Sequence, residues 1–159
     1  MPFRLIRPDD VPALQRFHGR LSEKTIYSRF FGSLKELPEA KANYFAHVDG
    51  VDRLAFVALD PDDPDEIIAL VRYDREPGSE RAEYSALVED RWQDHGVGIE
   101  LTRRLVDEAQ DKGVRFFYAM VMGQNTRILE LLRHLDLPEH ERVEDGVKHV
   151  EVELVSKAS

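Results

Sequence analysis

Apolar positions along the chain follow two different periods, and the change between them separates predicted helices from predicted strands. In the stretch 11–21 the apolar side chains recur every three or four residues, which predicts a helix with one buried face. From residue 54 onward, short runs rich in Val, Ile, Leu and Phe favour strands instead. We expect strands over 3–7, 54–59, 67–73, 82–88, 116–122 and 147–155, helices over 11–21, 22–31, 99–112 and 125–135, and one more helix starting at Leu37.

The order of these elements predicts a mixed sheet within one domain, residues 1–159. Mostly antiparallel strands come first, and the later unit of strand 82–88, helix 99–112 and strand 116–122 should hold a parallel pair. We therefore expect an α+β fold, built as a mixed α/β three-layer sandwich. The acidic stretch 60–66 lacks the spacing of a calcium loop, so it is interpreted as a solvated hairpin connection rather than a cation site.

Composition and charge narrow the possible functions. With 42% hydrophobic and 33% charged residues, the chain has the make-up of a soluble globular protein rather than a disordered one. It has no cysteine, which excludes disulfides, thiolate metal sites and cysteine nucleophiles. The net charge of −9 argues against general nucleic-acid binding and suits a basic substrate such as an amine, although solubility alone also explains it.

Membrane and metal partners are not expected either. No apolar run reaches the length of a membrane span, and the first residues lack a signal-peptide pattern, so we expect a cytoplasmic protein. The six histidines show no metal-binding spacing, and we predict no metal site.

The segment Gln93–Gly98 carries the strongest chemical signal. It lies between strand 82–88 and the helix that starts at Ile99, and it contains Gly96 and Gly98. A glycine turn between a strand and a helix aims backbone N–H groups at a phosphate. The pattern lacks the lysine of a P-loop and the third glycine of a dinucleotide fold. Taken alone, it also fits a helix-start turn that merely needs glycine.

The neighbouring residues point to one family. Gln93-x-x-Gly96-x-Gly98, placed after a strand and at the start of a helix, resembles the acetyl-CoA signature of the GNAT superfamily of N-acetyltransferases. The stretch 122–125, Met-Gly-Gln-Asn, is similar to the strand end and asparagine on the other side of the cofactor. Segments 22–31 and 82–88 look like the GNAT domains of bacterial protein lysine acetyltransferases, so the resemblance covers nearly the whole chain.

This resemblance implies a fold and a cofactor. The sheet is expected to be mostly antiparallel, with a splayed parallel pair and flanking helices, and acetyl-CoA is expected as co-substrate without any metal. The open backbone edge of the splayed strand would bond the arm of coenzyme A, and the N–H groups of the glycine turn would hold its diphosphate. The residues expected at the cofactor are Ala86, Leu87, Val88, Gln93, Asp94, His95, Gly96, Val97, Gly98, Ile99 and Asn125.

The resemblance also indicates Glu83 as the general base, because related protein acetyltransferases carry a glutamate ten residues before the glutamine. An alkyl ammonium has a pKa near ~10.4, so a base must remove its proton before the nitrogen can attack. Strand alternation places Glu83 on one face with Ser85 and Leu87. The alternative is a glutamate at the exposed start of the strand.

Three departures from the family pattern leave the activity open. Leu132 stands where many relatives carry a tyrosine acid, and His95 stands where many carry arginine, beside the acidic Asp94. Arg103 and Arg104 on the following helix could offset that acidity. The acceptor is thus expected to be a protein lysine or another primary amine, with a polyamine or aminoglycoside as an alternative. A catalytically silent acyl-CoA-binding sensor or partner module is the competing function, and superfamily analogy suggests a homodimer.

Overall fold

A computed structural model describes residues 2–22, 36–121 and 127–154. The described part contains one sheet of seven strands in the order β1-β2-β3-β4-β5-β7-β6. The strands are β1 (Phe3–Leu5), β2 (Arg53–Asp60), β3 (Asp63–Arg75), β4 (Arg81–Val88), β5 (Phe116–Val121), β6 (Glu139–Glu144) and β7 (Val147–Glu153). The helices are α1 (Val11–Gly19), α3 (Glu39–Ala46), α4 (Val97–Asp111) and α5 (Arg127–Arg133), with short 3-10 turns at Pro8–Asp10 and Asp90–Trp92.

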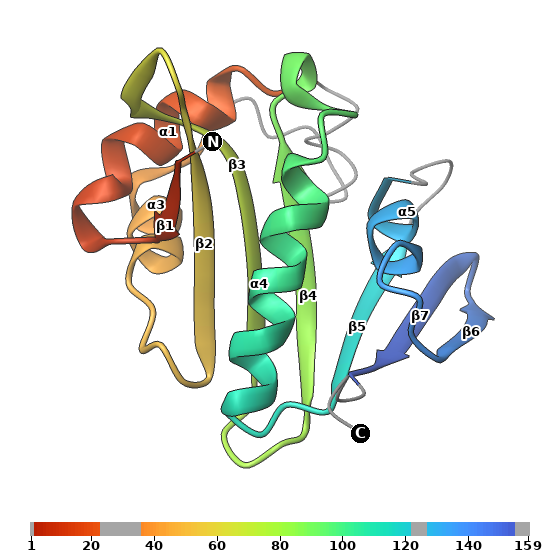
Figure 1. Cartoon of the computed structure of the whole chain (residues 1–159). Helices are drawn as coiled ribbons and strands as arrows, with labels where there is room; N and C mark the ends of the chain where they lie inside the picture. Colours follow the sequence, from red (N-terminus) through yellow and green to blue (C-terminus); the bar gives the residue numbers. More distant parts are fainter. Residues whose placement is uncertain (1, 23–35, 122–126, 155–159) are drawn as a thin grey trace.

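The sheet separates two cores, which gives the three layers expected from the sequence. Helix α4 packs on one face, where Leu101, Leu105 and Ala109 are buried against strand residues. Helices α1 and α3 cover the opposite face over β2 and β3, with Leu14 and Phe17 at the centre of that core (Figure 1). The predicted inward stripe of α4 is therefore confirmed, as is the mixed three-layer fold.

The parallel pair in the sheet is short, and it opens. Strands β4 and β5 form the sheet's parallel pairing through three residue pairs, Arg81 with Phe116, Ala82 with Phe117 and Glu83 with Tyr118. Beyond Glu83, β4 stays paired with β3 as far as Val88 but has no ladder partner on the β5 side within the described residues. Figure 1 shows β5 diverging from β4 toward the end that leads into α4. The splayed pair expected from the resemblance is thus present.

Several element boundaries differ from the sequence prediction. Strand β3 begins at Asp63, so much of the acidic stretch is strand rather than a free connection, and its pairing with β2 is irregular near Leu59. Helix α4 starts at Val97, two residues earlier than expected, and β1 ends at Leu5. Strand β6 was not predicted. The expected helix over 22–31 and the expected cofactor residue Asn125 lie outside the described residues.

Within the described residues, no helix has the length and apolar character needed to cross a bilayer.

Candidate functional site

The glycine turn ends β4 and starts α4 in a left-handed backbone conformation. Gly96 is the N-cap of α4 with φ 80°, and Asp94 two residues earlier has φ 66°. Because the first turn of a helix lacks intrahelical acceptors, its N–H groups need other partners. The N–H groups of Val97, Gly98 and Ile99 find none among the described residues. The turn therefore presents three donors at the positive end of the α4 dipole.

Gly98 has a different role from Gly96. Its backbone is helical, but a Cβ built on it would lie 3.0 Å from Cδ2 of Leu131 and 3.3 Å from Cγ2 of Val88. The missing side chain therefore lets the first turn of α4 approach both the end of β4 and helix α5. Gly98 packs the turn, whereas Gly96 sets its backbone shape.

The other residues predicted for the turn mostly brace it. The side-chain amide of Gln93 donates to the backbone oxygen of Val88 at 2.9 Å, which ties the turn to the strand that precedes it. The ring of His95 meets Trp92 edge-on, with centroids 5.7 Å apart. Asp94 forms an ion pair with Arg127 of α5 at 3.5 Å.

The cation that pairs with Asp94 comes from α5. Arg104 lies over the ring of Phe3 in β1, with its guanidinium carbon 4.5 Å from the centroid, two helical turns away from Gly96.

A pocket of about 450 Å³ opens beside the turn, between the N-terminus of α4 and helix α5. Gly96, Gly98, Trp92 and Arg127 contribute to its walls. The indole N–H of Trp92 is buried and has no hydrogen-bond partner. Unpaired buried donors are rare in native proteins, so this one marks a place where a ligand acceptor fits. The turn pocket thus brings together three backbone donors without a partner among the described residues, the ion pair of Asp94 with Arg127, and the unpaired indole N–H of Trp92.

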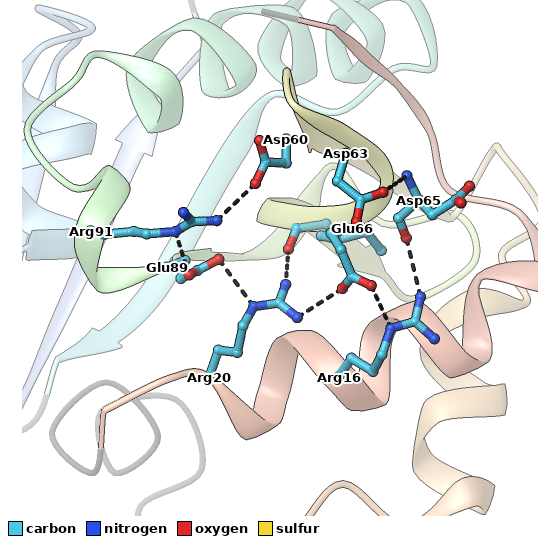
Figure 2. Close-up of polar contacts among 9 residues, drawn as sticks. Arg16, Arg20, Asp60, Asp63, Asp65, Glu66, Glu89 and Arg91 are labelled. Atoms are coloured by element: carbon cyan, nitrogen blue, oxygen red, sulfur yellow. Dashed lines mark hydrogen bonds and ion pairs between the residues drawn. The ribbon is translucent and has the colours of Figure 1, made fainter.

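An ion-pair network holds the segment between β4 and the turn. Glu89, directly after β4, is 5% exposed and accepts from Arg20 at 3.2 Å and from Arg91 at 2.8 Å. Arg91 also donates to Asp60 at the end of β2, at 2.8 Å (Figure 2). The approach to the glycine turn is therefore anchored to the end of α1 and to β2.

The same network continues along α1. Arg20 donates to Glu66 at 2.8 Å and to the backbone oxygen of Ile67 at 2.6 Å, and Arg16 donates to the other oxygen of Glu66 at 2.7 Å. Figure 2 shows Arg16 of α1 and Arg20, directly after α1, turned toward the start of β3. Sequence patterns do not indicate this network, because the partners of Arg16 and Arg20 lie 46 to 69 positions away from them and the acidic stretch lacks any motif.

Glu83 lies where β4 and β5 part. It occupies the last residue pair of the parallel ladder and faces the same side of the sheet as Asp74, its cross-strand partner on β3. Asp74 accepts hydrogen bonds from both Arg53 and Arg72. Burial alone would raise the pKa of Asp74, but Arg72 and then Arg53 outweigh it and hold that pKa below its usual range.

An open hollow surrounds the Glu83 side chain. It is lined by Tyr44, Asp74, Glu83 and Tyr118, with Arg53 and Arg81 at its walls. Both arginines are engaged, Arg53 with Asp74 and Arg81 with Glu151. Glu83 itself forms no ion pair within the described part of the chain, so it remains free to accept a proton from a ligand.

Tyr118 is a neighbour of Glu83 that the sequence did not indicate as functional. Burial raises its pKa, and the charge of Glu83 raises it further. The phenol therefore stays protonated at neutral pH and can donate a hydrogen bond beside the carboxylate. Its pairing with Glu83 depends on the register of the parallel ladder, which periodicity does not reveal.

Two expectations about chemistry can be checked directly. Leu132 is 1% exposed and packs in the α4-side core, so that position of α5 supplies no hydroxyl. Among the described residues, no three His, Asp or Glu side chains come close enough together to hold a metal ion.

Comparisons with known proteins agree with this geometry. The profile of the acetyltransferase (GNAT) family matches residues 22–136. Acetyltransferase PA5475 of Pseudomonas aeruginosa is 29% identical over 129 residues, which cover 80% of this chain and 69% of that protein. The GNAT domain of S. lividans PAT superposes with a TM-score of 0.86 at 30% identity, covering 95% of this chain and 89% of that domain. The fold is also shared, at 16% identity and a TM-score of 0.73, with yncA of Salmonella typhimurium, solved with its cofactor acetyl-CoA, over 99% of this chain and 96% of that one.

Proposed function

The chain belongs to the acetyltransferase (GNAT) family, and on that premise we propose which of its residues carry out the transfer. It is an acetyl-CoA-dependent N-acetyltransferase. We assign the general base to Glu83 and the cofactor cradle to the open edge of β4 together with the glycine turn. The observation that carries this proposal is the parting of β4 from β5 immediately after Glu83.

The glycine turn fits the diphosphate of coenzyme A. The N–H groups of Val97, Gly98 and Ile99 have no partner in the part of the chain that the structure describes, and the αL backbone of Gly96 leaves open space where a side chain would stand. Arg127 adds a positive charge at the same pocket. Helix N-termini of this kind bind phosphate groups through N–H donors and the helix dipole.

The edge of β4 fits the arm of coenzyme A, which carries two amides. Ala86, Leu87 and Val88 pair with β3 on one side only. Backbone groups on the other side can therefore exchange hydrogen bonds with the amides. Gln93 already occupies the oxygen of Val88, so Ala86 and Leu87 are the stronger candidates.

Glu83 precedes Ala86 and Leu87 on the same strand, and we place it beside the reacting end of acetyl-CoA. In the transfer, the amine nitrogen bonds to the thioester carbonyl carbon, the C–S bond breaks, and the thiolate leaves as coenzyme A. Glu83 takes the ammonium proton, directly or through a water, because its carboxylate is not committed to an ion pair. An N–H on the β4 edge can donate to the carbonyl oxygen as charge develops there.

The hollow around Glu83 favours a cationic acceptor. Its arginines are neutralised by carboxylates, whereas Glu83 adds a negative charge between Tyr44 and Tyr118. Acidic and aromatic walls together attract an alkyl ammonium group. We propose a primary amine as acceptor, with the lysine side chain of a protein as one such amine.

The test compares wild type with Glu83→Gln, following release of coenzyme A from acetyl-CoA with a panel of primary amines. We expect kcat to fall by about 10²–10⁴-fold, with the Kd for acetyl-CoA unchanged. Glu76→Gln is the matched control, because Glu76 lines the same hollow but is exposed and lies beyond the end of β3. Unchanged turnover in Glu83→Gln would rule out the assigned base.

The competing function is a silent acyl-CoA-binding module, motivated by the buried Leu132 in place of a hydroxyl acid. Acetyl-CoA binding without turnover on any amine would support it. A Gly96→Glu variant tests the cradle separately, since a carboxylate placed at the turn should repel the diphosphate. Retained acetyl-CoA binding in that variant would remove the turn from the cofactor site.

A further inference from the structure

A second pocket, which we call the Arg72 pocket, lies on the sheet face opposite α4. It lies between the sheet and helices α1 and α3. Its walls are mainly apolar, with Leu14 and Phe17 from α1, Phe45 from α3 and Leu70 from β3. Two polar residues on neighbouring strands, Arg72 and Ser85, share this lining.

Arg72 brings an unsatisfied donor to this pocket. Its side chain is 2% exposed, and Nε and Nη2 donate to Asp74 at 3.0 and 2.7 Å. Its Nη1 group is buried and has no hydrogen-bond partner. The guanidinium carbon lies 4.7 Å from the ring centroid of Phe45, a contact that leaves the Nη1 protons unpaired. A buried charged donor without an acceptor is costly, so a natural sequence keeps one where a ligand supplies the acceptor.

Ser85 supplies a second donor at the same place. It is the cross-strand partner of Arg72, so both side chains project to the same face from adjacent positions. Its hydroxyl makes no hydrogen bond with any described residue, and the residue is 8% exposed. Arg72 and Ser85 thus give this mainly apolar lining two polar side chains, and ligand pockets of this kind use a few such groups to orient a ligand.

Arg72 retains one donor for a ligand oxygen. The single carboxylate of Asp74 is shared by Arg53 at 3.0 Å and Arg72 at 2.7 Å. Glu83, beyond Asp74 in the open hollow, forms no ion pair with either guanidinium among the residues described. Because Nε and Nη2 already bind Asp74, Nη1 is the part of the guanidinium that is left for a ligand oxygen.

We propose that the Arg72 pocket binds a carboxylate carried on a short apolar stem by one of the two substrates. The inference rests on the proposed function, because Ser85 directly precedes the β4 edge assigned to the acyl-CoA arm. The carboxylate has two possible sources. It is either the far end of a dicarboxylic acyl group on coenzyme A or the carboxylate of an amino-acid acceptor.

The experiment measures binding by calorimetry, so it does not depend on turnover. One arm compares succinyl-CoA with acetyl-CoA. The other compares free leucine, methionine and lysine with their amides, in the presence of coenzyme A. We expect wild type to prefer the carboxylate ligand by about tenfold or more in one arm, and that arm identifies the source.

Variants then test whether Arg72 causes the preference. Arg72→Met should reduce it to less than about twofold, and Ser85→Ala should weaken it while preserving the fold. Arg53→Met is the matched control, because Arg53 also binds Asp74 but lies outside the Arg72 pocket. The control should keep the preference, and thermal unfolding checks that each variant is folded.

Two results would overturn the proposal: equal binding in both arms for wild type, or a preference that survives in both Arg72→Met and Ser85→Ala. Failure of the proposed function gives a different result. A protein that does not acetylate amines can still be tested by calorimetry for its preference between acids and their amides.

Discussion

Replacing Gly96 by alanine isolates the energetic cost of the left-handed turn. Gly96 has φ 80°, and a Cβ built there meets no atom within 4 Å. Steric crowding with neighbours therefore contributes nothing, and only the backbone conformation opposes a side chain. For an L-residue that conformation costs about 1–2 kcal/mol. In a domain of this size, such a loss lowers the Tm by about 2–8 °C.

Gly19 offers a matched control for the same substitution. It is the last residue of α1, its backbone is not left-handed, and a Cβ there also meets nothing within 4 Å. Alanine is favoured over glycine in a helix by about 0.5–1 kcal/mol, so Gly19→Ala should leave stability unchanged or raise it. Gly96→Asn should fall between wild type and Gly96→Ala, because asparagine adopts the left-handed conformation more readily.

Urea unfolding and thermal melts give the free energies, and calorimetry with acetyl-CoA reports the state of the turn. We expect Gly96→Ala to lose affinity as well as stability, because the strained turn misdirects the N–H groups of Val97 and Gly98. A Gly96→Ala protein as stable as Gly19→Ala would refute the reasoning. It would mean that the turn does not need the left-handed conformation.

Three further substitutions test the packing and the ion pairs. Glu89→Gln should lower the free energy of unfolding in urea by about 1–3 kcal/mol, since it removes the buried negative charge and replaces one of the two oxygens that accept from Arg20 and Arg91 with an NH2 donor. Glu144→Gln on the exposed β6 should change it little. Tyr84→Phe should cost about 1–3 kcal/mol because it leaves the buried Thr102 hydroxyl unpaired across a 2.6 Å contact, and adding Thr102→Val should restore part of that loss. Burial raises the pKa of Tyr73 to about 12, above its unfolded value near 10, so its contribution to stability is complete below pH 10 and is lost as the pH rises toward 12. Urea titrations at pH 9 and pH 11 should therefore show a drop of about 1 kcal/mol, and a smaller drop in Tyr73→Phe; identical drops in the two proteins would contradict this cause.

Periodicity predicted the elements that bury one face and failed where backbone pairing or charge decides the structure. Helix α4 was recognisable because Leu101 and Leu105 recur on its buried side. Strand β6 was not, because its one apolar residue, Val143, is 70% exposed and the strand is held by pairing with β7. Periodicity also missed the start of β3, because its acidic residues are held by backbone pairing with β2 and by an ion pair with α1.

The candidate site divides along the same line. A local motif identified Gly96 and Gly98, and alternation placed Ser85 and Leu87 on the face opposite Tyr84, whose hydroxyl meets Thr102 of α4. The roles of Arg72 and Glu89 depend on partners brought together only by sheet register and by the packing of α1. No single-sequence pattern encodes such distant partners.

The three residue pairs between β4 and β5 give the sheet a weak seam between two unequal parts. On one side lie β1 to β4, and on the other lie β5, β7 and β6 with α5, while the α4-side core extends across both parts. A molecule that hydrogen-bonds to the open edge of β4 and also contacts α5 connects the two parts of the sheet. Amide hydrogen exchange along both edges should then slow when acetyl-CoA binds, by more than it slows at the distant β1 edge. In mechanical terms, acetyl-CoA would take the place of the missing strand pairing beside β4. Its binding and release in each catalytic cycle would strengthen and then weaken the contact between the two parts of the sheet.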